Sequence, residues 1–149
     1  MKRTLLTLAV ALVCVTMAMF SYSQGNKTNN KLQQLPRMAQ TFINKHFANL
    51  EVAKVKYEKD DGVGEYEVHF KGGNEVDFDA KGKWTKVDCK AAKVPAALIP
   101  TKIAKYVATN YPGAHITEIQ RSSRGYEVEL CNALDIDFSP SFKVIKVDH

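Results

Sequence analysis

The sequence has few of the groups that carry out chemistry. Its 149 residues include three cysteines, four histidines and one tryptophan, and neither a Cys-x-x-Cys nor a His-Glu-x-x-His motif occurs. The histidines, at positions 46, 69, 115 and 149, are far apart, and none is close in sequence to Cys89 or Cys131. This pattern offers neither a nucleophile beside a base nor a cluster of metal ligands. We therefore predict a protein that is not an enzyme and has no cofactor.

A large charge of one sign is also missing. The chain has 21 basic and 16 acidic residues, a formal net charge of +5, and loss of Lys2 and Arg3 with a leader would leave +3. The basic residues are scattered and form no continuous stripe of the kind that phosphate binding requires. We therefore expect no nucleic-acid partner.

Long apolar runs are absent except for one at the start. Lys2 and Arg3 precede an apolar stretch from Leu5 to Phe20, and Ser21-Tyr22-Ser23 then provides small residues for cleavage before Gln24. The run is shorter than the roughly 20 residues that span a bilayer. Residues 1–23 are thus predicted to be a signal peptide, cleaved on export to the periplasm or the outside, with no membrane attachment afterwards. The polar residues 24–34 are expected to be disordered.

Only Cys89 and Cys131 remain after such cleavage. An exported protein meets an oxidising environment, in which the two could form a disulfide. Nothing in the sequence places them close together, so two separate thiols are the alternative.

The rest of the chain contains the same unit twice, at residues 35–89 and 99–149, with residues 90–98 as a connector. Tyr66-Glu67-Val68 corresponds to Tyr126-Glu127-Val128, and Lys86-Val87-Asp88 corresponds to Lys146-Val147-Asp148. The offset is 64 residues in the first half of the unit and 60 in the second. Such self-similarity predicts two tandem copies of one structural unit.

Each unit reads as one helix followed by four short strands. Pro36 and Pro100 suit the first turn of a helix, and apolar residues then recur at three-and-four spacing. The remaining segments alternate apolar and polar residues between turns, which is typical of antiparallel hairpins with one buried face. We predict an α+β fold in which both helices pack on one face of the combined sheet.

Strand alternation places a set of charged residues on the opposite, polar face. The single tryptophan shares its parity with Lys86, so it is expected to stand among the acids as a binding anchor. The candidate binding residues are Trp84, Lys86, Glu67, His69, Glu75, Asp77, Glu127, Glu129, Asp135, Asp137 and Lys146. Two alternatives remain open: an ordinary solvated sheet face with the tryptophan as local core, or calcium binding by the paired acids.

Several motifs resemble one known family. Leu35-Pro36 followed by Phe42-Ile43 and Phe47, then Tyr66-Glu67-Val68, Trp84 near Val87-Asp88-Cys89, and Leu98-Ile99-Pro100 are similar to the PepSY-like domain. Its members are β-lactamase-inhibitor-like exported proteins of Bacteroidetes. The resemblance implies a tandem helix-plus-sheet fold like that of the β-lactamase inhibitory protein, whose concave sheet grips an enzyme. It implies no catalytic residues.

Together these features predict an exported, non-catalytic binding module. Its concave polar sheet face would recognise a protein or peptide of the cell envelope, and the acidic surface favours a basic partner. The alternatives are a small-ligand or calcium-binding envelope protein, and a structural or stress protein without a specific ligand.

Overall fold

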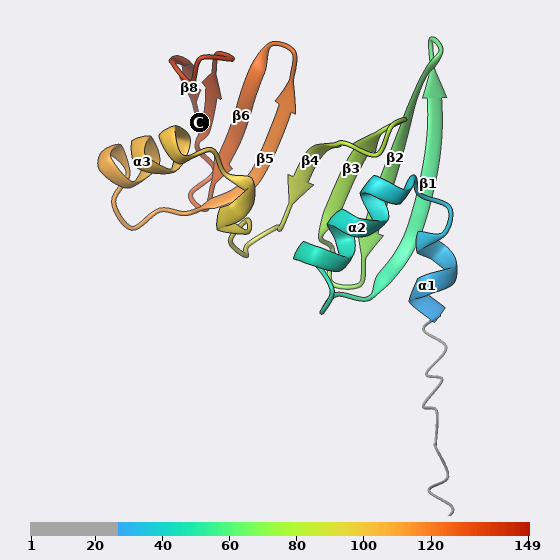
Figure 1. The fold of residues 1–149 in the computed structure, drawn as a ribbon. Coiled ribbons are helices and arrows are strands. Elements are labelled where there is room, and N and C mark those ends of the chain that lie inside the picture. The colour runs from blue at the N-terminus through green and yellow to red at the C-terminus, as the bar shows by residue number, and fades with distance from the viewer. Residues whose placement is uncertain (1–26) are drawn as a thin grey trace, which may run out of the picture.

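The computed structural model describes residues 27–149, which form one antiparallel sheet with helices on one side (Figure 1). The helices are α1 (Lys27–Leu32), α2 (Arg37–His46), the 3-10 turn η1 (Ala96–Leu98) and α3 (Thr101–Asn110). The strands are β1 (Val52–Asp60), β2 (Val63–Phe70), β3 (Glu75–Asp79), β4 (Trp84–Asp88), β5 (Ile116–Ser122), β6 (Gly125–Leu130), β7 (Asp135–Phe138) and β8 (Val144–Asp148). The mixed α+β class is thereby confirmed.

The eight strands lie side by side in the order of the sequence. Each strand is antiparallel to the next, so the chain runs up and down from β1 to β8 without a crossover. The middle of the sheet is the pairing of β4 with β5, which joins Lys86 to Gln120, Val87 to Ile119 and Asp88 to Glu118. The sheet is therefore continuous across the two halves of the chain.

Both long helices cover the same face of this sheet. A row of paired residues crosses it without a change of face, and all are fully buried: Val68, Val76, Val87, Ile119, Val128 and Ile136. Phe78 and Phe138 share that face, because each lies two residues beyond a member of the row. The ring of Phe42 on α2 meets Phe78 edge-on at 5.5 Å, and Tyr106 on α3 meets Phe138 in the same way at 5.4 Å.

The helices begin where the prolines predict. Pro36 and Pro100 occupy the N-cap positions of α2 and α3, immediately before the first helical residue. The buried residues of the helices are Ala39, Ile43, Ile103 and Val107, four residues apart in each case. This spacing lets one stripe of each helix pack on the apolar face of the sheet.

From Lys27 onward, the N-terminal segment differs from the expectation of disorder over residues 24–34, of which residues 24–26 lie outside the described part of the chain. Helix α1 begins at Lys27, and Leu32 and Leu35 are buried in the core. The side chain of Lys31 also donates hydrogen bonds to the carbonyl oxygens of Val52 (3.2 Å) and Ala53 (2.7 Å) on β1. Two leucines and one lysine thus attach a segment whose polar composition alone suggested a free tail.

The predicted leader, residues 1–23, lies outside the described residues. Within the described part of the chain, no helix is long and apolar enough to span a membrane.

One glycine shows how tightly β6 approaches β7, and its substitution is our first prediction. Gly125 has a backbone φ of +128°, and a Cβ atom there would overlap the carbonyl oxygen of Phe138. We expect Gly125→Ala to lower the free energy of unfolding by roughly 3 kcal/mol or more, because the backbone of β7 would have to move. The measurement is urea unfolding followed by circular dichroism.

Gly62 provides the matched control. It also has a positive φ, +84°, but a Cβ atom on this residue would have no other atom within 4 Å. Gly62→Ala should therefore cost only about 1 kcal/mol, the backbone contribution alone. Equal losses in the two variants would contradict the close packing of β6 on β7.

Candidate functional site

The face of the sheet opposite the helices carries two parallel rows of charged and polar side chains, which we call the polar face. Paired residues make up each row, since strand register brings them side by side. One row runs through Lys56, Glu67, Asp77, Lys86, Gln120, Glu127, Asp137 and Lys146. The other runs through Lys54, His69, Glu75, Asp88, Glu118, Glu129, Asp135 and Asp148. All seven predicted acids and both predicted lysines lie here.

In the first half of the polar face, the charges neutralise one another. Glu67 accepts from Lys56 at 2.8 Å and lies 3.0 Å from Nε2 of His69, whose Nδ1 is 3.0 Å from Glu75. Lys86 then lies 3.8 Å from Glu75 and 3.6 Å from Glu118. This chain of pairs, the charge network, links β1 to β5.

The charge network also governs how its members titrate. The hydrogen bond from Lys56 lowers the pKa of Glu67, and His69 acts in the same direction. Burial opposes the charge of Lys86, but Glu118, Glu75 and Asp77 outweigh it and raise the pKa of the lysine. The first half therefore has few carboxylates left to attract a partner.

The second half has the same strand register but lacks the cations. Gln120 pairs with Glu127 where Lys56 pairs with Glu67, and Glu129 pairs with Asp135 where His69 pairs with Glu75. Lys146 forms its ion pair with Asp148. Among the described residues, no lysine, arginine or histidine nitrogen lies within 4.0 Å of the carboxylates of what we call the acidic quartet: Glu127, Glu129, Asp135 and Asp137.

The pKa of Glu127 reflects the uncompensated negative charge of the second half. Burial raises the pKa of Glu127, and the neighbouring Asp137 and Asp135 raise it further. Lys86 and Lys146 act against this rise but do not cancel it. A cation bound here would relieve the repulsion between the carboxylates.

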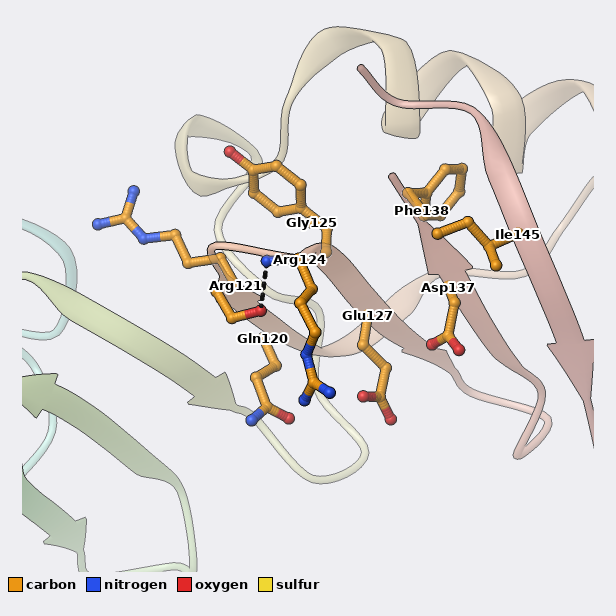
Figure 2. Close-up of a pocket in the computed structure, with 10 residues that line it drawn as sticks. Gln120, Arg121, Arg124, Gly125, Glu127, Asp137, Phe138 and Ile145 are labelled. Atoms are coloured by element: carbon orange, nitrogen blue, oxygen red, sulfur yellow. Dashed lines mark hydrogen bonds between the residues drawn. The ribbon is translucent and has the colours of Figure 1, made fainter. Parts of the chain in front are cut away.

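A cavity of about 350 Å³ lies beside the acidic quartet, at the end of β5 to β8 (Figure 2). Gln120, Arg124, Glu127 and Asp137 point to the same side of the sheet in this view. Ile145 and Phe138 add apolar surface to the lining. The lining thus combines two acidic residues, two arginines (Arg121 and Arg124) and apolar residues, which suits a long side chain with a charged end better than a bond-making reaction.

Trp84 does not lie on the polar face, which corrects the prediction that it stands among the acids. It is 9% exposed and belongs to the core, with its ring 6.3 Å from that of Phe42. The cause is a bulge in β4: Asp77 pairs with Lys86 but Phe78 pairs with Trp84, so Thr85 is an extra residue. One extra residue in a strand moves the side chains of the residues before it to the opposite face of the sheet.

The tryptophan instead fixes a contact between β4 and β5. The guanidinium of Arg121 lies 3.9 Å above the ring of Trp84, and its Nε donates a hydrogen bond of 2.7 Å to the Trp84 carbonyl oxygen. Sequence reasoning missed this partner, because nothing in the local pattern relates residues 37 positions apart. It missed Asp88 and Glu118 as well, although strand alternation could have placed both on the polar face.

The two cysteines are not bridged, which corrects the suggestion of a disulfide. Both are free thiols; Cys89 is buried and Cys131 is exposed. Burial raises the pKa of the Cys89 thiol, so this group is an inert member of the core. In the part of the chain that the structure describes, no group of three or more His, Cys, Asp or Glu side chains is arranged to hold a metal ion.

Asp77 is the most unusual acid of the polar face. It is 9% exposed, and its Oδ1 atom is buried without a hydrogen-bond partner. Burial, reinforced by Glu75 and Glu65, raises the pKa of Asp77 from its ordinary value of 3.8 to about 7. Near neutral pH this side chain therefore exists partly as the uncharged acid.

This pKa leads to our second prediction. The unfolded chain loses the Asp77 proton near pH 4, whereas the folded protein keeps it until about pH 7. The contribution of Asp77 to the free energy of unfolding is therefore full below pH 4 and is lost as the pH rises to 7. Asp77→Asn cannot ionise, so its stability relative to the wild type should increase over this window, by up to about 4 kcal/mol. Urea unfolding at several pH values measures this.

Asp137→Asn is the control, because Asp137 occupies the corresponding place opposite Glu127 but is more exposed. It should change the pH dependence of unfolding less than Asp77→Asn does, because Asp137 is less buried than Asp77. A pH-independent difference between Asp77→Asn and the wild type would show that Asp77 is an ordinary surface acid.

Comparison with known proteins agrees with this architecture. Residues 64–146 match the family described as "Putative beta-lactamase-inhibitor-like, PepSY-like". None of the curated proteins matches the chain.

Three crystal structures resemble it over 79% of its length. A "putative periplasmic protein" of Bacteroides vulgatus is 47% identical with a TM-score of 0.77, and the match covers 93% of that chain. A "putative calcium-regulated periplasmic protein" of Bacteroides thetaiotaomicron is 46% identical with a TM-score of 0.76, also over 93% of its chain. Another protein of Bacteroides vulgatus, described as periplasmic and of unknown function, is 38% identical with a TM-score of 0.76, over 94% of its chain. The chain therefore belongs to the PepSY-like family of beta-lactamase-inhibitor-like proteins.

Proposed function

We propose that the chain is a non-catalytic binding module of the periplasm that takes a basic segment of a protein or peptide partner on the second half of its polar face. The observation that carries this proposal is the acidic quartet, whose carboxylates have no cationic partner among the described residues, while those of the first half are largely paired. The periplasmic location is supported by the descriptions of the three similar structures.

The chemistry of the cavity indicates the kind of group that binds. A lysine or arginine side chain could place its charged end between Glu127 and Asp137, which are cross-strand partners. Its aliphatic stem would then lie against the exposed side chain of Ile145, which lines the same cavity. Arg124, on the rim, would repel a partner with two adjacent cations and favour a neighbouring acidic or neutral residue.

Duplication of a helix-and-four-strand unit accounts for the two halves having the same layout. Its support is the matched register: Tyr66 and Glu67 face Phe78 and Asp77, just as Tyr126 and Glu127 face Phe138 and Asp137. On this interpretation the first copy keeps its cations and serves as a rigid support, and the second copy has become the binding half. The six first-copy residues predicted to bind are then mainly structural.

Restraint of a hydrolase is the role that the family description suggests, and the site is compatible with it. Shared fold does not transfer a target, however. The target class therefore follows from the site chemistry, which selects a partner with an exposed basic segment.

Calcium binding is the second candidate, favoured by the description of the Bacteroides thetaiotaomicron relative as calcium-regulated. The described residues contain no group of three or more ligands around one point. Binding would therefore require a rearrangement of the acidic quartet. Calorimetric titration with Ca²⁺ distinguishes the candidates: heat and a raised melting temperature support calcium, and the absence of both removes it.

The third prediction concerns partner capture. The chain from Gln24 onward, which includes every described residue, is immobilised and exposed to periplasmic extract of its source, and retained proteins are identified by mass spectrometry. A specific partner should be retained by the wild type and should be lost on the Glu127→Lys, Asp137→Lys variant. Retention should also weaken with added salt, since the encounter is driven by charge.

Glu67→Gln, Lys56→Gln is the control, because it removes an ion pair of the first half of the polar face while conserving the net charge. It should retain the partner as well as the wild type does. Loss on the control but not on the Glu127 and Asp137 variant would move the site to the first half. Equal recovery on all three proteins would reject the polar face as the binding surface.

A further inference from the structure

The last strand of the sheet is unusually exposed. All five residues of β8 are exposed, including Val144 (38%), Ile145 (65%) and Val147 (42%). Val147 corresponds to Val87 in the repeated sequence, so strand parity alone would predict that it is buried as Val87 is, and the structure shows that it is not. Among the described residues, β8 pairs with β7 on one side and with no strand on the other.

Strand β4 is the counterpart of β8 in the first half of the chain, and its outer side is covered by another strand. It pairs with β3 in the same register as β8 with β7, including the bulge: Trp84 with Phe78, Lys86 with Asp77 and Val87 with Val76. On its other side β4 carries β5, and there Val87 is fully buried. The exposed valines of β8 are thus those that an added strand would cover.

At the opposite edge of the sheet, the first two residues of β1 have their carbonyl oxygens occupied. On β5, the carbonyl oxygens of Ile116 and Thr117 accept from the backbone N–H groups of Val94 and Cys89, at 2.9 Å each. The corresponding carbonyls on β1, of Val52 and Ala53, accept from Lys31 instead. A lysine that occupies edge carbonyls discourages strand addition. Head-to-tail joining of β8 to β1 of another molecule, which would give an open filament, is therefore disfavoured.

The backbone of β8 has the geometry to pair with β8 of a second copy of the chain. The backbone N–H of Cys89 donates to Thr117 on β5. Along an antiparallel strand, the backbone N–H and C=O groups of residues two apart point to the same neighbouring strand, so those of Val87 also face β5. Val147 is the counterpart of Val87, so its N–H and C=O groups face outward from β8. A two-fold axis through this residue would place Val147 opposite Val147 of a second copy as a hydrogen-bonded pair.

The charged residues of β8 are also compatible with a two-fold axis through Val147. Antiparallel pairing centred on Val147 sets Lys146 opposite Asp148 of the second copy, and Asp148 opposite its Lys146. These two residues flank Val147 on the polar face and already pair within one chain. Centring on Lys146 would instead oppose two lysines, which is unfavourable.

We propose that β8 is a self-association edge, through which two copies of this chain pair antiparallel about Val147 and join their sheets into one. The acidic quartets of the two copies would then lie on one continuous face, on either side of the two-fold axis. Such an arrangement presents two sites for basic segments to a single partner and increases avidity.

The test is the mass of the chain from Gln24 onward, measured by light scattering and sedimentation equilibrium over a wide range of concentrations. The wild type should be a dimer. Val147→Pro removes an outward N–H group from an edge strand, where proline is tolerated, and should give a monomer with a nearly unchanged melting temperature.

Charge variants test the register and leave the backbone intact. Lys146→Asp and Asp148→Lys should each weaken the dimer about tenfold, because like charges then face each other twice. The double variant Lys146→Asp, Asp148→Lys restores opposite charges and should restore the dimer. A wild type that is monomeric at every concentration overturns the proposal. So does a dimer that persists in all three single variants, or a double variant that is no tighter than the singles.

Discussion

The organisation of this protein depends on the register of one apolar row across its sheet. Val76, Val87, Ile119, Val128 and Ile136 are paired from strand to strand and fully buried. Because side chains alternate along a strand, this row forces the residues between its members onto the opposite face. A slip of one residue at β4 and β5 would bring Lys86 and Glu118 into the core. The row therefore fixes the helix side and the polar face together.

The two halves of the polar face share one strand register and differ in a few of their charged residues. In the first half Lys56 pairs with Glu67 and Lys86 with Glu75, and His69 lies between the two acids. The second half has Gln120 and Glu129 in the corresponding register. Lys54 also has an acid, Glu118, as its counterpart, so three differences make the second half more acidic than the first in the same strand register. The bulge in β8 adds Ile145 to the cavity beside it.

Much of this could be predicted from the sequence, because it depends on local periodicity. Both long helices, the alternation of the strands and the placement of the seven acids follow from residue spacing and turn chemistry. The facing of Trp84 could not be predicted, since a bulge reverses strand parity and leaves no clear mark in the sequence. The exposure of Val147 depends on which strand lies at the sheet edge, which is a property of the assembled sheet.

Ion pairing was also beyond sequence reasoning, and it distinguishes the two halves of the polar face. The predicted site treated Glu67 and Glu127 alike, whereas the structure gives only Glu67 a lysine partner. Such differences arise from cross-strand neighbours, such as Lys56 and Gln120, that lie in other strands. The missed residues Arg121 and Glu118 belong to the same class, because their partners, Trp84 and Lys86, come from distant parts of the chain.

The central claim is that the acidic quartet, and not the charge network, attracts a basic segment. Nuclear magnetic resonance of the nitrogen-15-labelled chain, titrated with a lysine-rich peptide at low salt, tests it most directly. The account predicts that backbone amide shifts concentrate in β6, β7 and Ile145, and that added salt reverses them. Shifts concentrated in β2 and β3, or spread evenly over all charged surfaces, would contradict it.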